Sequence, residues 1–274
     1  MLRFHRFLAP TALSALLLST LSAHADLQYT MQMSAAQDGE TKPISTTTTY
    51  LKDGLERMDS ITQIATFRAE ERTISNAAKR ETITIDPNLK IYVSEPLSLP
   101  GGTNADGMNT KPVGQAGNGK MVLTLGSQLL GTDKMLDMET RHYKTSMGID
   151  STGCCGTGHS DTKSETWMAD IKVPTLSNAP FDWRRAFDQE GTKCKINFER
   201  RGDVDKYDAA QKGLALKTIT SDASGSVLAI QEVTKLSLAP LPDVTFQAPT
   251  AFKKVTRSQY DQARQKAMVA AFTG

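Results

Sequence analysis

The three cysteines carry the sharpest chemical pattern in the sequence. Cys154 and Cys155 are adjacent between two glycines, and Cys194 follows about forty residues later. In an oxidising compartment a disulfide is the default state of such residues. Because a bridge between adjacent cysteines is strained, Cys194 is expected to pair with either Cys154 or Cys155. One thiol is then left over.

The left-over thiol has three open roles. It could be inert, it could join two chains, or it could combine with the other cysteines and His159 in a soft-metal site for zinc or copper. Residue types alone leave these roles open. We expect the disulfide to be structural, and we assign no metal ligand.

No group of residues forms a catalytic set. Two of the four histidines precede residue 26, which leaves His142 and His159. His142 alternates along an expected strand and is interpreted as structural. His159-Ser160-Asp161 places three triad residue types side by side, but a triad converges in space from separate segments. We therefore predict no enzyme, no catalytic residue and no cofactor.

The N-terminus predicts export. Two arginines precede an apolar run over residues 7–21, and Ala23-His24-Ala25 fits the pattern read by signal peptidase. The run is shorter than the ~20 apolar residues of a spanning helix. Asp26 stands where a lipoprotein would carry cysteine. Residues 1–25 are thus predicted to be a cleaved signal peptide, and residues 26–274 a single domain in the bacterial periplasm with at most peripheral membrane contact.

The charge balance argues against nucleic acid as a partner. The chain has 32 Lys and Arg against 30 Asp and Glu, and the predicted signal peptide removes Arg3 and Arg6 but no acidic residue. The mature chain is therefore formally neutral. Because a nucleic-acid binder neutralises phosphates with clustered Lys and Arg in excess, we expect no nucleic-acid partner.

Alternation of apolar and polar residues predicts a mainly antiparallel β fold. Leu27, Tyr29, Met31 and Met33 alternate with polar residues, as in a strand with one apolar and one wet face. Turn residues then define two hairpins. These are 44–51 with 55–60, joined by Lys52-Asp53-Gly54, and 83–85 with 89–93, joined by Asp86-Pro87-Asn88.

The remaining segments extend this pattern. Further strands are expected over 121–125, 135–147, 165–170 and 243–247. The strands 213–220 and 226–238, split by Ala223-Ser224-Gly225, are expected to form a third long hairpin. Helices are expected over 178–189, 203–212 and 257–272. The Gly-, Asn- and Pro-rich segment 96–119 is predicted to be a long mobile loop. Hairpins in series with few helices give an antiparallel sheet.

Five short stretches, in a fixed order, carry a resemblance to known proteins. They are Tyr50-Leu51-Lys52-Asp53-Gly54-Leu55-Glu56-Arg57-Met58-Asp59, the hairpin through Asp86 and Tyr92, Glu165-Thr166-Trp167-Met168-Ala169, Gly213-Leu214-Ala215-Leu216-Lys217 and Val244-Thr245-Phe246-Gln247-Ala248-Pro249. The chain resembles exported relatives of the periplasmic lipoprotein-carrier superfamily, also called outer-membrane lipoprotein carrier-like proteins. The resemblance implies an α+β fold, a half-open β-barrel of curved antiparallel strands with a few helices over its mouth and a C-terminal helix. Segments 96–119 and 151–164, the second of which holds two cysteines, look like insertions.

The resemblance also implies a concave apolar face that holds acyl chains or another hydrophobic partner. Six residues are expected to contribute to it: Tyr29, Met31, Met33, Met58, Ile91 and Phe246. The predicted function is therefore a soluble binding protein for a lipid, an acylated protein or another hydrophobic ligand. Two alternatives stay open: a redox or soft-metal-handling envelope protein that acts through Cys154, Cys155, His159 and Cys194, and a structural or stress-related partner protein.

Overall fold

The computed structural model describes residues 26–37, 40–64, 67–97, 117–173 and 194–273. The predicted signal peptide, the predicted helix over 178–189 and residues 98–116 of the predicted loop lie outside the described residues.

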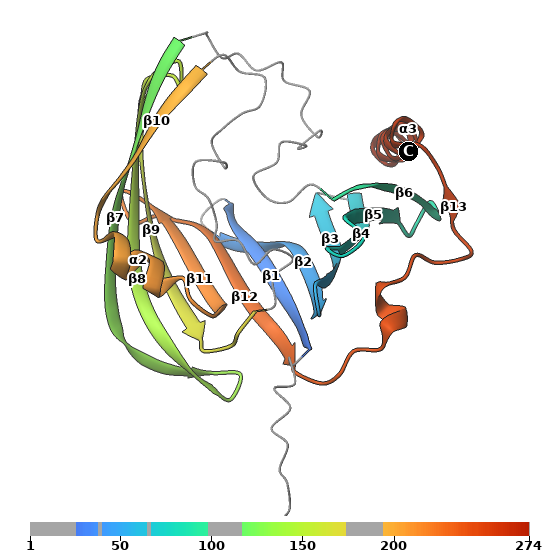
Figure 1. Ribbon diagram of the computed structural model, residues 1–274, viewed down its shortest axis with the longest axis horizontal. Helices are drawn as coiled ribbons and strands as arrows, with labels where there is room; N and C mark the ends of the chain where they lie inside the picture. Colours follow the sequence, from blue (N-terminus) through green and yellow to red (C-terminus); the bar gives the residue numbers. More distant parts are fainter. Residues whose placement is uncertain (1–25, 38–39, 65–66, 98–116, 174–193, 274) are drawn as a thin grey trace, which may run out of the picture.

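Within the described ranges, thirteen strands form one sheet (Figure 1). The strands are β1 (Leu27–Gln37), β2 (Glu40–Lys52), β3 (Leu55–Ile64), β4 (Phe67–Asn76), β5 (Glu81–Asp86), β6 (Ile91–Pro96), β7 (Gly117–Met135), β8 (Met138–Gly153), β9 (Gly158–Ala169), β10 (Cys194–Gly202), β11 (Leu214–Asp222), β12 (Val227–Ser237) and β13 (Lys253–Lys254). Their order across the sheet is β10-β7-β8-β9-β11-β12-β1-β2-β3-β4-β5-β6-β13.

The sheet is mainly antiparallel and open. Only the outermost pairs of the described sheet, β10 with β7 and β13 with β6, are parallel. Two α-helices, α2 (Val204–Ala210) and the C-terminal α3 (Arg257–Thr273), and the 3-10 helix η1 (Asp243–Phe246) complete the described elements. The predicted fold class is confirmed: an open, half-barrel-like antiparallel sheet with few helices and a helix at the C-terminus. No helix in the described ranges has both the length and the apolar character needed to cross a bilayer.

The two faces of the sheet carry different C-terminal segments. Glu71 and Ile74 of β4 are three residues apart and so point to opposite faces. Arg264 of α3 forms an ion pair with Glu71, whereas Phe246 of η1 packs with Ile74. Figure 1 shows the sheet bent, with α3 on the inside of the bend and η1 on the outside. We call these the inner face and the outer face.

Two clusters of buried apolar side chains form the described core. The first lies on the central strands and contains Leu27, Leu51, Ala169, Leu214, Leu216 and Val233. The second lies on the outer face and contains Ile74, Ile85, Leu241 and Phe246. The segment that follows β12 therefore serves as the outer cover of β4 and β5.

The three predicted hairpins are confirmed, as β2–β3, β5–β6 and β11–β12. In the second hairpin the Asp86 carboxylate accepts hydrogen bonds from the backbone N–H groups of Asn88 (3.0 Å) and Leu89 (2.9 Å). An Asp side chain that bonds the backbone two or three residues later fixes a tight turn. Leu89 consequently lies in the turn and not in the predicted strand.

The predicted strand over 243–247 is wrong, because Asp243–Phe246 is a 3-10 helix. In a strand Val244 and Phe246 would point to the same side. Here Val244 is 68% exposed and Phe246 only 9% exposed. One turn of 3-10 helix therefore buries only one of these two apolar residues. Apolar residues two positions apart are compatible with a strand and with a 3-10 helix, so their spacing alone does not distinguish the two structures.

The cysteine-bearing segment 151–164 forms a regular part of the sheet. It comprises the end of β8, a short turn and the first part of β9, and the two strands pair from Ser151 with Gly158 onward. Strand β7 likewise begins at Gly117, inside the predicted loop 96–119. Side chains at this end of the sheet are largely exposed on both faces, so their sequence lacks the alternation that marks a half-buried strand.

Candidate functional site

The register of β1, β2 and β3 brings four of the predicted binding residues onto one face. Tyr29 pairs with Thr49, and Thr49 pairs with Met58. Because directly opposed residues of antiparallel strands share a face, Tyr29 and Met58 point the same way across β2. Met31 and Met33 follow at the strand period of two, so they share that face.

This shared face is the inner face, which α3 covers farther along the sheet. Met31 pairs with Thr47, Thr47 with Ser60, and Ser60 with Glu71, the ion-pair partner of α3. The fifth predicted residue, Ile91, pairs with Asp86. The Asp86 carboxylate lies 3.4 Å from the Arg264 guanidinium of α3, so Ile91 also belongs to the inner face.

The inner face combines apolar and hydroxyl side chains. Tyr29, Met31, Met33, Met58 and Ile91 are all half-buried, so none is sealed in the core. Between them lie hydroxyl residues of β2 and β3, among which the Thr47 and Ser60 hydroxyls form a hydrogen bond of 3.2 Å. The face thus offers methionine and tyrosine contacts beside hydrogen-bonding groups. Methionine is a flexible side chain that adapts to irregular apolar partners.

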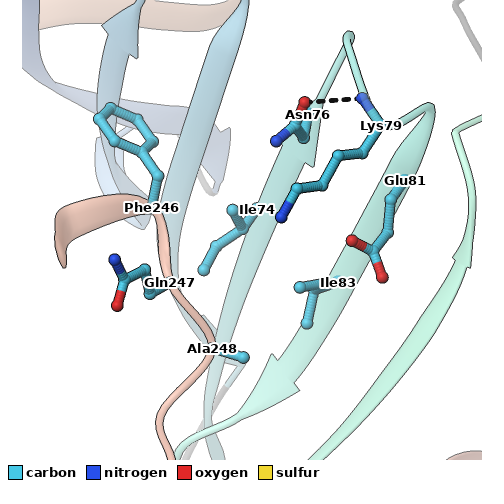
Figure 2. Close-up of a pocket in the computed structure, with 8 residues that line it drawn as sticks. All are labelled: Ile74, Asn76, Lys79, Glu81, Ile83, Phe246, Gln247 and Ala248. Carbon is cyan, nitrogen blue, oxygen red and sulfur yellow. Dashed lines mark hydrogen bonds between the residues drawn. The ribbon is translucent and has the colours of Figure 1, made fainter. Parts of the chain in front are cut away.

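The sixth predicted residue, Phe246, lies on the outer face, so the prediction that it joins the others is wrong. The chain leaves β12, crosses the outer face and buries Phe246 against Ile74 and Ile85. Phe246 lines a cavity of about 160 Å³ there (Figure 2), together with Ile74, Asn76, Lys79, Glu81, Ile83, Gln247 and Ala248. Ligand pockets are typically ~300–1,000 Å³, so this cavity is too small for a lipid.

Helix α3 is attached to the inner face mainly through charged groups. Arg257 pairs with Glu95 of β6, and Arg264 pairs with Glu71 and Asp86. Tyr260 is only 1% exposed and lies between the two guanidinium groups, at 5.6 and 5.7 Å from its ring. Its hydroxyl has no hydrogen-bond partner among the described residues, and burial raises its pKa far above the ordinary value for tyrosine.

A second charged group fixes the outer face of β3 and β4. The Asp59 carboxylate accepts hydrogen bonds from Arg57 and Arg72, in each case at 2.8 Å from the guanidinium Nε. Arg57 also donates to the Thr245 carbonyl, within η1. Burial alone would raise the pKa of Asp59, but the two guanidinium groups outweigh burial and lower it. This group ties the sheet to the segment that covers it.

His142 and His159 are each engaged with neighbouring side chains. The His142 ring stacks on the Trp167 ring with centroids 4.0 Å apart, and the Trp167 indole donates to Asp133 at 2.7 Å. His159 lies between two carboxylates, with Nδ1 2.7 Å from Asp150 and Nε2 2.8 Å from Asp161. Both ring nitrogens are therefore occupied, and neither is left to act as a base toward Ser160. These hydrogen bonds raise the pKa of His159.

The cysteines meet where β7, β8 and β10 come together. Parallel pairing places Cys194 beside Gly117, and the turn after β8 brings Cys154 across to it. Cys154 and Cys194 form a disulfide with an S–S distance of 2.00 Å. Cys155 keeps a free thiol, whose sulfur lies 3.9 Å from that of Cys194. His159, a ligand in the soft-metal alternative, is engaged with its two carboxylates instead.

Comparison with known proteins gives matches in structure and not in sequence. No family model and no curated protein matches the chain. An uncharacterised conserved protein from Thermus thermophilus matches over 86% of this chain and 93% of its own, at 11% identity and a TM-score of 0.40. The likeness is one of fold.

Two further structures match at similar levels. A chain of the MucA/MucB complex from Pseudomonas aeruginosa matches over 84% of this chain at 11% identity and a TM-score of 0.35, and this chain spans only 58% of its length. A domain from Vibrio parahaemolyticus, described as outer membrane lipoprotein-sorting, matches over 81% of this chain and 89% of its own, at 13% identity and a TM-score of 0.30.

Proposed function

We propose that the mature protein binds a lipid or an acylated protein on the inner face of its sheet, in the periplasm. The observation that carries this proposal is the alignment of Tyr29, Met31, Met33 and Met58 on one half-buried face. An apolar face that is neither fully buried in the core nor fully exposed to solvent is typical of a binding surface. The predicted signal peptide supports the periplasmic location.

The chemistry of the inner face suits an amphipathic ligand. The methionine and tyrosine side chains would contact an acyl chain by dispersion. The Ser and Thr hydroxyls between them would bind a headgroup or a peptide. The hydroxyls of Thr47 and Ser60 already form a hydrogen bond with each other, so neither is left unpaired when no ligand is bound.

Helix α3 would border the bound ligand. It lies over β4 and β6, on the same face as Met31 and toward one end of the sheet. Its ion pairs with the sheet are partly exposed, and such pairs contribute little stability, about 0–1 kcal/mol each. Loss of these ion pairs therefore costs little free energy, and the buried Tyr260 supplies most of the resistance to a shift of the helix.

A fatty-acid fluorophore tests the proposal. We expect saturable binding to residues 26–274, and we expect Met31→Asp or Met33→Asp to weaken it about ten- to hundredfold, since each change replaces an apolar contact worth about 1.5–3 kcal/mol with a charge. Gln32→Asp is the matched control, because Gln32 lies between the two methionines and points to the outer face. Gln32→Asp should bind as the unaltered protein does.

Competition then identifies the ligand class. Unlabelled fatty acid should displace the fluorophore if the site takes free lipid, and an acylated peptide should displace it better if the hydroxyls also contact a polypeptide. Absence of saturable binding, or equal loss in Met31→Asp and Gln32→Asp, would contradict binding on the inner face.

A further inference from the structure

The three cysteines form a compact group whose arrangement is set by the backbone. Their sulfur atoms all lie within 4.8 Å of one another. Cys154 and Cys155 occupy the turn between β8 and β9, while Cys194 begins β10, on the far side of β7. A single bridge thus joins a hairpin turn to the edge strand across the first residues of β7.

Glycine residues make the space in which the sulfurs lie. A Cβ atom at Gly119 of β7 would approach the Cys155 sulfur to 2.3 Å and the Cys154 sulfur to 3.2 Å. Gly153 and Gly156, which flank the two cysteines, both have positive φ (70° and 79°), which residues with a Cβ rarely adopt. The turn therefore holds both adjacent cysteines against β7 and within reach of Cys194.

We propose that these residues form a thiol–disulfide exchange site in which the bridge to Cys194 passes between Cys154 and Cys155. The Cys155 thiol loses its proton to water, and the thiolate attacks the Cys194 sulfur. The S–S bond to Cys154 breaks as the bond to Cys155 forms, and Cys154 leaves as a thiolate that takes up a proton. One disulfide and one thiol are present before and after the step, so no oxidant or reductant is consumed.

The geometry fits this step better than a bridge between the adjacent cysteines. Cys155 already lies 3.9 Å from the sulfur that it attacks. It approaches the bridge from the side, so rotation about its Cα–Cβ bond is needed to align the three sulfurs. The alternative product, a Cys154–Cys155 bridge, would join neighbours in sequence and would be strained.

Exchange would present a reactive thiol at either of two adjacent positions. Cys154 and Cys155 are both half-buried, in a turn at one end of the sheet. The released thiolate would attack one sulfur of a small-molecule disulfide: a mixed disulfide with the protein forms as the S–S bond of the small molecule breaks, and the second half of that molecule leaves as a thiolate. This activity is separate from ligand binding on the inner face and does not depend on it.

Cysteine variants of the protein, purified without reductant, test the proposal. We expect Cys154→Ser and Cys155→Ser each to form a bridge with Cys194 and to have no free thiol by titration under denaturing conditions. The unaltered protein should have one free thiol, and alkylation followed by tandem mass spectrometry should find the label on both Cys154 and Cys155. Label appearance on Cys154 should accelerate about tenfold per pH unit below the thiol pKa, because the thiolate is the nucleophile.

Gly119→Ala provides a second, independent test. Its new methyl group would displace the Cys155 sulfur, so the label should shift toward Cys155 while the Cys154–Cys194 bridge remains. Gly158→Ala is the matched control, since its Cβ would meet only the Ser151 hydroxyl oxygen at an ordinary 3.7 Å. Label confined to Cys155 at every pH, together with two free thiols in Cys154→Ser, would overturn the proposal.

Discussion

Met31 of β1 and Glu71 of β4 point to the same side of the sheet, in register across β2 and β3. Arg264, which binds Glu71, therefore attaches α3 to the face that holds the half-buried methionines. Because this attachment combines the buried Tyr260 with ion pairs at the margin of the sheet, part of its strength depends on charge and on salt.

Arg264→Ala should loosen α3 without unfolding the sheet. The change removes the ion pairs with Glu71 and Asp86, and a partly exposed pair contributes about 1 kcal/mol, which corresponds to roughly fivefold faster opening. Hydrogen exchange of the α3 amides, followed by mass spectrometry, measures this opening. Lys266→Ala, at an exposed position of the same helix, should leave exchange unchanged. Equal exchange in the two variants would show that these ion pairs do not hold the helix.

Phe246→Ala should destabilise the protein and spare binding of the fatty-acid fluorophore. Phe246 is buried on the outer face, and truncating a buried phenylalanine costs about 3–5 kcal/mol. Val244→Ala, two residues away and mostly exposed, should change the free energy of unfolding by less than about 0.5 kcal/mol. Denaturant unfolding gives both values. If the Phe246→Ala protein kept full stability but no longer bound the fluorophore, Phe246 would have to be assigned to the binding face.

Asp59→Asn should reduce stability in a manner that depends on pH. Arg57 and Arg72 lower the pKa of Asp59 in the folded protein. The resulting stabilisation is fully present above the unfolded pKa of about 3.9 and is lost as pH falls through the lower folded pKa. The gap in unfolding free energy between the unaltered protein and Asp59→Asn should therefore be constant from pH 7 to 5 and shrink below about pH 4. Asp53→Asn, at an exposed turn position, should show no such gap.

His159 should titrate above the ordinary histidine value of about 6.5. Its hydrogen bonds to Asp150 and Asp161 favour the protonated ring, so their stabilising effect is present below that value and is lost as pH rises through the higher folded pKa. An NMR titration of the His159 ring protons measures the pKa. Asp150→Asn and Asp161→Asn should each lower it, whereas Asp222→Asn, in another turn, should not. A His159 pKa that neither substitution moves would refute this assignment.

Local sequence patterns predict the strands that have one apolar face and one polar face. The alternation of β1 and the turn chemistry at Asp53 and Asp86 are each sufficient to identify a strand or a hairpin. By contrast, β4 escapes prediction, because it carries charged residues at successive positions and shows no sustained period of two. The edge strand β10 does alternate from Cys194 to Glu199, so this pattern is sufficient to predict it, although it is not among the expected strands.

The residues of the candidate site also differ in whether the local sequence predicts their position. Tyr29, Met31 and Met33 lie on one strand, so the period of two is enough to group them. Met58 and Ile91 join them only through the register of paired strands. Phe246 depends on which side of the sheet the chain takes after β12, and local spacing carries no information about that choice.

The position of β1 at the centre of the sheet has a consequence for the order of folding. Its neighbours are β2, the next strand in sequence, and β12, in which Ser237 pairs with Gln28. Hairpins β2–β3 and β5–β6 close over short loops and can form early, whereas the two halves of the sheet join only when a strand near the C-terminus reaches the N-terminal one. Contacts so distant in sequence slow folding. The nascent chain would therefore remain without its central pairing until almost all of it has been made.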